Sequence, residues 1–289
     1  MHRYWVWCLA LGVSLGVSGV QAARLVVSIE PLAMLAEPLL GPEDQLQVVL
    51  PANRSPHHYA LRASDLRALQ SADLVLWVGP ILEPFLEKPL RQHPAAQPVM
   101  QLPGLQWPHQ DAHSDHAHGD RDPHLWLNPD NAVLIIRWLA AQLILAAPDQ
   151  AAAIAVRRDQ TLARLSALTE RLAQQLSPLG EMAFIAHHPA YGHFNQRFGL
   201  RQLAWVALTP EQKPGARHLM ALQQQAAGAK CLVTESFYDS HNSQQLARQL
   251  GLRQVVLDPM GAGVGPAPQR YERLLEQLAS GLQDCLAPA

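Results

Sequence analysis

The sequence predicts an α/β protein with two Rossmann-like lobes, each built on a parallel sheet, joined by one long rigid linking helix. Three observations support this fold class. Short apolar runs alternate with stretches of helical spacing in both halves of the chain, and one long helical stretch between them has no strand of its own. In addition, 48% of the 289 residues are hydrophobic. A chain of this length can form two domains and bury a substantial core.

The first lobe is predicted to span residues 23–148. Apolar and β-branched runs that end at proline or glycine, as at Pro31, Gly41 and Pro51, are typical of buried strands and short helices. The expected strands lie at residues 24–29, 45–50, 73–78 and 98–102. The expected helices lie near 32–40, 82–92 and 129–147, and a further helix is expected to start at Ser64 and Asp65.

Residues 149–177 are predicted to form the linking helix. Leucines recur there at spacings of three and four, with arginine and glutamine between them, and Pro178 and Gly180 end the pattern. At 1.5 Å per residue this helix would be roughly 40 Å long. The second lobe is predicted over residues 178–289. Its expected strands lie at 183–186, 202–206, 231–234 and 254–257, and its expected helices at 192–198, 217–227, 243–250 and 269–286.

Residues 1–22 predict a cleaved secretory signal peptide. Arg3 precedes an apolar stretch interrupted by Gly and Ser, and Val20-Gln21-Ala22 has the small-x-small form of a cleavage site. Cleavage one residue later fits almost as well, and an uncleaved membrane anchor is the alternative. Because the stretch is short for a membrane-spanning helix, we expect a mature protein in the periplasm.

Charge and cysteine content narrow the class of protein further. A net charge of −2 leaves no basic stripe for phosphates, so no nucleic-acid partner is expected. Cys231 and Cys285 both lie beyond the predicted signal peptide. In an oxidising compartment an even pair favours a disulfide over two free thiols.

Three histidines are candidate metal ligands. His57 follows the predicted strand at 45–50, His188 follows the strand at 183–186, and His124 lies where a polar loop ends. Ligand sites of open α/β sheets lie at such strand ends. Neutral imidazoles suit Zn²⁺, which prefers four tetrahedral ligands.

A fourth ligand would be a carboxylate or water. Asp258 ends the last predicted strand and Glu235 ends the one before it. Both therefore belong to the rim where the strands end, as the candidate histidines do. Either carboxylate could instead cap the helix that follows.

Residues 109–122 form a polar loop rich in histidine and aspartate. We expect it to bind metal weakly and to concentrate ions near the main site. A solvated loop with incidental affinity is the alternative. Its histidines are His109, His113, His116 and His118.

Five segments resemble the cluster A-I metal receptors of ABC transporters, in particular the zinc subgroup of high-affinity periplasmic solute-binding proteins. They are HHYALRASD at 57–65, ADLVLWVG at 72–79, HLWLNP at 124–129, HPAYG at 188–192 and LDPMG at 257–261. The resemblance covers essentially the whole mature chain. Pro56 stands where some relatives carry an acidic residue, and His58 and His187 adjoin assigned ligands, which leaves the register open by one residue.

This resemblance implies a function. The chain would capture Zn²⁺ through His57, His124 and His188, with Asp258 as fourth ligand, and deliver it as a monomer. The partner would be an ABC importer permease in the inner membrane with its cytoplasmic ATPase. The resemblance also implies a Cys231–Cys285 bridge. Manganese and iron receptors tend to place a carboxylate at the third position, where this chain has His188, so imidazole there favours zinc.

Two other functions remain open. A zinc hydrolase would need an open coordination position and a general base, but the sequence has neither a His-Glu-x-x-His nor a Gly-x-Ser-x-Gly motif. We therefore expect no enzyme. A zinc buffer or adhesin that works without a transporter would share every ligand with the receptor.

Overall fold

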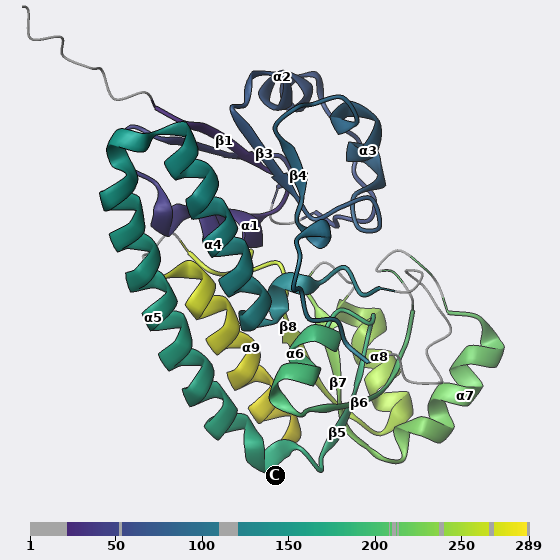
Figure 1. Cartoon of the computed structure of the whole chain (residues 1–289). Helices are drawn as coiled ribbons and strands as arrows, with labels where there is room; N and C mark the ends of the chain where they lie inside the picture. The colour runs from purple at the N-terminus through teal and green to yellow at the C-terminus, as the bar shows by residue number, and fades with distance from the viewer. Residues whose placement is uncertain are drawn as a thin grey trace, which may run out of the picture.

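The computed structural model describes residues 22–51, 54–109, 121–207, 209, 212, 214–236, 240–265 and 269–287. Most of the predicted signal peptide and residues 110–120 of the predicted loop lie outside these ranges. Within them the chain forms two lobes, each with a four-stranded parallel sheet, and one long helix runs beside both lobes (Figure 1). The predicted fold class is confirmed.

The first lobe contains a sheet in the order β2-β1-β3-β4 with three helices. Its strands are β1 (Arg24–Val27), β2 (Gln45–Val48), β3 (Leu74–Trp77) and β4 (Ala96–Pro98). Its helices are α1 (Glu30–Ala36), α2 (Ala63–Ser71) and α3 (Pro84–Leu90). This lobe also contains three 3₁₀ turns, which are η1 (Glu37–Leu39), η2 (Val99–Gln101) and η3 (Leu125–Leu127). β1 and β3 occupy the centre of the sheet and are almost wholly buried, which explains their continuous apolar sequences.

The fourth strand differs from the sequence-based expectation. Strand β4 ends at Pro98, where the expected strand at 98–102 would begin, and the residues after it form η2. Proline has no N–H to continue the ladder. Val99, Met100 and Leu102 are nevertheless buried, so the apolar pattern reflects the core while the backbone turns.

The second lobe has the same topology, with the order β6-β5-β7-β8. Its strands are β5 (Ala183–Ala186), β6 (Arg201–Trp205), β7 (Ala229–Glu235) and β8 (Arg253–Leu257). Its helices are α6 (Gly192–Phe198), α7 (Ala216–Ala226), α8 (Ser240–Leu250) and α9 (Arg270–Leu286). All of β5 is buried, as expected of a central strand in a parallel sheet.

Two helices connect the lobes. Helix α4 (Pro129–Ala146) leads through η4 (Pro148–Gln150) into α5 (Ala151–Leu176), which has 26 residues and ends at η5 (Ser177–Leu179). Arg157 of α5 donates from Nε to the Leu39 carbonyl in the first lobe at 2.9 Å, and Arg171 pairs with Glu276 of α9 at 2.7 Å. Helix α5 therefore contacts both lobes, as a linking helix should.

Helix α4 is the one helix among the described residues that is long and apolar enough to cross a membrane. Its residues Ile135, Leu139 and Leu143 are buried, and the helix packs against α1 and α5. These contacts are those of a core helix.

The two lobes also contact each other directly. Trp126 Nε1 donates to the Pro259 carbonyl at 2.9 Å, and the Tyr271 hydroxyl donates to the Trp126 carbonyl at 2.5 Å. Gly261 has a φ of 71°, and a Cβ there would lie 2.6 Å from the Met34 side chain. Only glycine therefore allows this close approach between the lobes.

The predicted disulfide joins Cys231 of β7 to Cys285 of α9, with a Cα–Cα distance of 5.6 Å. Both cysteines are fully buried. The bond fastens the last helix to the second sheet, and closing such a loop stabilises the fold by about 4 kcal/mol in the chain-entropy account.

Candidate metal centre

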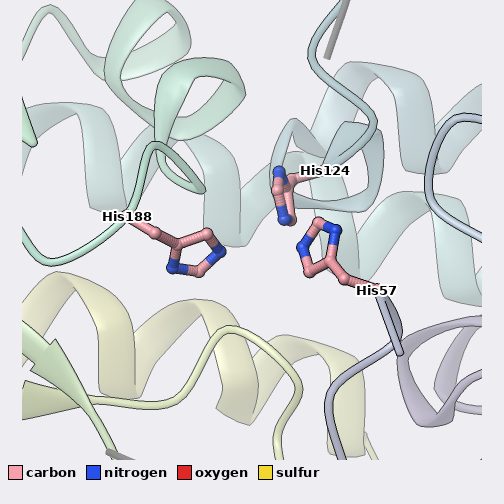
Figure 2. A group of neighbouring side chains, drawn as sticks. All are labelled: His57, His124 and His188. Carbon is pink, nitrogen blue, oxygen red and sulfur yellow. The ribbon is translucent and has the colours of Figure 1, made fainter. Parts of the chain in front are cut away.

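Three separate segments bring His57, His124 and His188 together. His57 lies in a turn that follows β2, and His188 lies two residues after β5, so each comes from the carboxyl end of a strand in a different lobe. His124 immediately precedes η3. Figure 2 shows the three imidazoles facing one another. The rim that the sequence predicted is thus formed by both lobes and the segment between them.

The geometry of this group fits a metal ion. One potential ligand atom from each histidine lies within 4.8 Å of the other two, and the exposed fractions of His57, His124 and His188 are 8%, 2% and 2%. Nitrogens bound to one tetrahedral zinc lie roughly 3.3 Å apart, from Zn–N bonds of about 2.0–2.1 Å. The ligand nitrogens therefore need to move closer by at most about 1.5 Å to share one ion.

Asp122 orients His124. Its Oδ1 accepts from the His124 backbone N–H at 2.9 Å and lies 2.8 Å from His124 Nδ1. Burial disfavours ionisation of Asp122, but His124 and its hydrogen bonds outweigh burial and keep the pKa of this carboxyl below its usual value. An ionised carboxylate at Nδ1 fixes the tautomer that presents Nε2 to a metal.

Glu235 plays the same part for His188. Its Oε1 contacts His188 Nδ1, and both side chains are almost fully buried. Glu235 ends β7, next to β5, so the parallel pairing of these two strands brings the carboxylate to the histidine. The contact on Nδ1 orients the ring, and Nε2 is the nitrogen that can bind a metal.

Asp258 lies outside the three-histidine group. Its Oδ1 accepts from the backbone N–H groups of Met260 and Gly261 at 2.9 and 3.0 Å, and its Oδ2 accepts from that of Gly263 at 3.2 Å. Over the described ranges, the group of potential ligand side chains contains the three histidines and no carboxylate. The carboxylate of Asp258 thus caps the turn that follows β8, whereas the sequence-based alternative was a helix cap, and α9 begins only at Arg270.

The neighbouring histidines His58 and His187 are not in the group either. His58 is exposed. Burial, reinforced by the nearby His188, lowers the pKa of His187 to about 4, so this ring is neutral at ordinary pH. The geometry therefore selects His57 and His188 from the two adjacent pairs.

Of the predicted weak metal loop at 109–122, only residues 109, 121 and 122 are described. His109 is exposed, and its backbone N–H donates to Gln196 Oε1 at 2.7 Å. His113, His116 and His118 lie outside the described residues, so their role stays a prediction.

Sequence reasoning missed two residues that support the site. Asp122 was included in the polar loop, although its position two residues before His124 is a usable signal for a carboxylate–histidine pair. His193 of α6 was not singled out at all, and it contacts the Asp122 carbonyl at 2.9 Å. No sequence pattern marks that contact.

Comparisons with known proteins identify the family of this chain. A family model described as zinc-uptake complex component A, periplasmic (ZnuA), matches residues 25–285. The high-affinity zinc uptake system protein ZnuA of Haemophilus ducreyi is 31% identical over 299 residues, which cover 94% of this chain and 96% of that protein. Its counterpart from Paracoccus denitrificans is 30% identical and covers 97% of both chains.

Solved structures of related proteins have a similar fold. A crystal structure of ZnuA has a TM-score of 0.78 and 25% identity, covering 92% of this chain and 100% of that chain. The periplasmic zinc binding protein TroA from Treponema pallidum has a TM-score of 0.79 at 18% identity, which supports the fold alone. The resemblance suggested by the five sequence motifs is confirmed, and the chain belongs to the family of periplasmic A components of zinc-uptake complexes.

Proposed function

We propose that this chain is an exported zinc receptor that binds one Zn²⁺ ion through His57, His124 and His188. The observation that carries the proposal is the convergence of three buried imidazoles, two of them held at Nδ1 by a carboxylate. Buried neutral imidazoles with carboxylate partners are typical zinc ligands.

The fourth coordination position is assigned to water. The carboxylates of Glu235 and Asp258 are already engaged, with His188 and with three backbone amides. A position filled by solvent suits an ion that must be released, because no fourth protein ligand has to dissociate. The same engagement argues against a hydrolase, since neither carboxylate is placed to act as a general base.

Delivery is assigned to an ABC importer in the inner membrane, a permease with its cytoplasmic ATPase, which the receptor meets as a monomer in the periplasm. Three observations support this assignment. They are the predicted signal peptide at 1–22, the Cys231–Cys285 disulfide and membership of the zinc-uptake family. The two-lobed fold supports it as well, because the three proposed ligands come from both lobes and from the segment between them.

Single alanine substitutions test the ligand set. Replacing His57, His124 or His188 should weaken zinc binding by at least about tenfold in a competition titration with a chromogenic chelator. His58→Ala and His187→Ala are matched controls, each one residue away from a ligand, and should bind zinc as the parent does. Tight binding by His188→Ala together with weak binding by His187→Ala would move the ligand by one residue and refute the assignment.

Two further measurements test the fourth coordination position and the delivery of zinc. Asp258→Asn should change zinc affinity by less than about threefold, well below the loss expected for a ligand; a loss of tenfold or more would make Asp258 the fourth ligand. Growth of a receptor-deficient strain in zinc-limited medium tests delivery. Restoration by the parent chain but not by His124→Ala supports a receptor, whereas no restoration by a zinc-binding parent supports a buffer.

A further inference from the structure

His193 is a buried histidine that lies outside the metal-binding group. It belongs to α6, and 1% of its surface is exposed. Its Nε2 lies 2.9 Å from the Asp122 carbonyl oxygen, and its Nδ1 lies 3.3 Å from Asn131 Nδ2. Because a carbonyl can only accept a hydrogen bond, Nε2 carries the proton and Nδ1 accepts from the amide. These two partners require a neutral ring with one defined tautomer.

The two contacts of His193 reach the segment that carries a proposed ligand. Asp122 is held through its main-chain carbonyl by His193, and its side chain holds the His124 ring. Asn131, the second partner, also exchanges two hydrogen bonds with the backbone of Gln106, at 2.8 and 2.9 Å. One imidazole of the second lobe therefore connects the His124 segment, the start of α4 and the chain before the polar loop.

A second observation places α6 directly against Asp122. A Cβ built on Gly192, the residue before His193, would lie 2.5 Å from Asp122 Oδ2. Glycine at this position lets the helix approach the carboxylate more closely than any other residue would allow. The main chain and the side chain of Asp122 are thus both fixed by α6, one by a hydrogen bond and one by close packing.

We propose that His193 is a positioning residue for zinc, which fixes Asp122 and through it the ring of His124 without touching the ion. This inference rests on the proposed zinc site. If the Nε2 hydrogen bond is lost, the Asp122 backbone can shift, and the carboxylate no longer holds the His124 ring in one orientation. Partners of metal ligands typically contribute about tenfold to a hundredfold to affinity, and a residue one contact further away should contribute at the low end of that range.

Two polar substitutions isolate this hydrogen bond. In His193→Gln the side-chain amide can reach the position of Nε2 and donate to the Asp122 carbonyl. In His193→Asn the shorter amide reaches only the position of Nδ1, so the bond to Asp122 is lost. Both variants bury one amide in place of the imidazole, and comparing them separates the hydrogen bond from general disturbance of the core. His218→Ala is the control, because this exposed histidine also contacts a main-chain carbonyl, that of Trp205 at 2.8 Å from its Nε2, but not that of Asp122.

The test is zinc affinity of the mature chain, measured by competition with a chromogenic chelator. We expect His193→Asn to bind about tenfold more weakly than the parent, and His193→Gln and His218→Ala to bind within about threefold of it. In a His124→Ala background, His193→Asn should cause no further loss, because its effect acts through His124.

Two outcomes would overturn the inference. One is equal affinity of His193→Asn and His193→Gln; the other is the same loss from His193→Asn with and without His124. The proposed zinc site is tested separately, since it fails if any one of His57→Ala, His124→Ala and His188→Ala retains the affinity of the parent. Melting temperatures of the Asn and Gln variants check that both fold to a similar extent.

Discussion

Glu83 provides a test of the structure that is independent of zinc. It lies just before α3 and is 0% exposed, and its Oε2 accepts from the backbone N–H groups of Val78 and Gly79 at 2.7 and 3.2 Å. Burial raises the pKa of Glu83 to about 7, and hydrogen bonds from Ser28, Gly79 and Val78 only partly oppose that rise. In the folded protein the Glu83 carboxyl is therefore mostly protonated below about pH 7.

The size and sign of the effect follow from this pKa. The gap between about 7 in the folded state and the usual 4.5 corresponds to about 3 kcal/mol. Because the folded-state pKa lies above the unfolded one, the stabilisation is fully present below about pH 4.5 and is lost as the pH rises through 7. In Glu83→Gln an amide oxygen can still accept from the two backbone N–H groups, but the side chain cannot ionise.

The assay is urea unfolding of the zinc-free mature chain from pH 4.5 to pH 8, for the parent and for Glu83→Gln. Between these limits the variant should gain about 3 kcal/mol of unfolding free energy relative to the parent. Other titrating groups are common to both proteins and cancel in this difference. Glu43→Gln, at an exposed position, is the control and should show no such gain. A difference between parent and Glu83→Gln that does not change with pH would refute the reasoning.

Two other predictions concern the loop and the disulfide. Deleting residues 109–120 should remove weak zinc equivalents that disappear as the pH falls through about 6 to 7, because protonated imidazole cannot bind metal, and should leave one tight equivalent. Isothermal titration at pH 7.5 and pH 6 measures both, and loss of the tight equivalent would contradict the separation of loop and site. Reducing the Cys231–Cys285 bond should lower the melting temperature while zinc binding is retained, since the bond joins β7 to α9 within the second lobe. An unchanged melting temperature, or two alkylated cysteines in native periplasmic protein, would count against this role.

Sequence patterns predicted the second lobe well where strong local signals mark the start and the end of a strand or helix. The strand at 183–186 and the helix at 192–198 have the expected bounds. The helix is followed by Gly199, whose φ of 68° is the left-handed conformation that ends many helices. The strand is a four-residue apolar run with no competing helical period. Local chemistry fixes such elements, and distant contacts add little to their placement.

The fourth strand of the first lobe shows where this reasoning fails. Val99, Met100 and Leu102 are buried because they pack in the core of the lobe, and burial alone does not distinguish a strand from a 3₁₀ turn. The Leu102 N–H closes the turn by donating to the Val99 carbonyl at 3.0 Å, and the Met100 N–H joins the turn to the chain after β3 by donating to the Val78 carbonyl at 3.0 Å. The second contact joins segments far apart in the chain, and no local pattern encodes it.

The candidate metal centre likewise has residues that the sequence could predict and residues that it could not. His57, His124 and His188 could be chosen from the sequence because each follows a recognisable element or motif. The partners of these residues could not be assigned, because a carboxylate near a strand end can cap a helix, bind a metal or orient a histidine. The tertiary structure determines which role each carboxylate takes, with Asp258 on a backbone turn and Glu235 on His188.

In the proposed function, this division of roles lets one site bind an ion tightly and still release it. The three ligands come from three segments, and His57 belongs to a different lobe from His188. Asp122 and Glu235 orient their histidines from outside the group, so the strength of each Zn–N bond can be high without a fourth protein ligand closing the site. In the proposed release, a wider separation of the two lobes increases the distance between His57 and His188, and the site loses the three-histidine geometry.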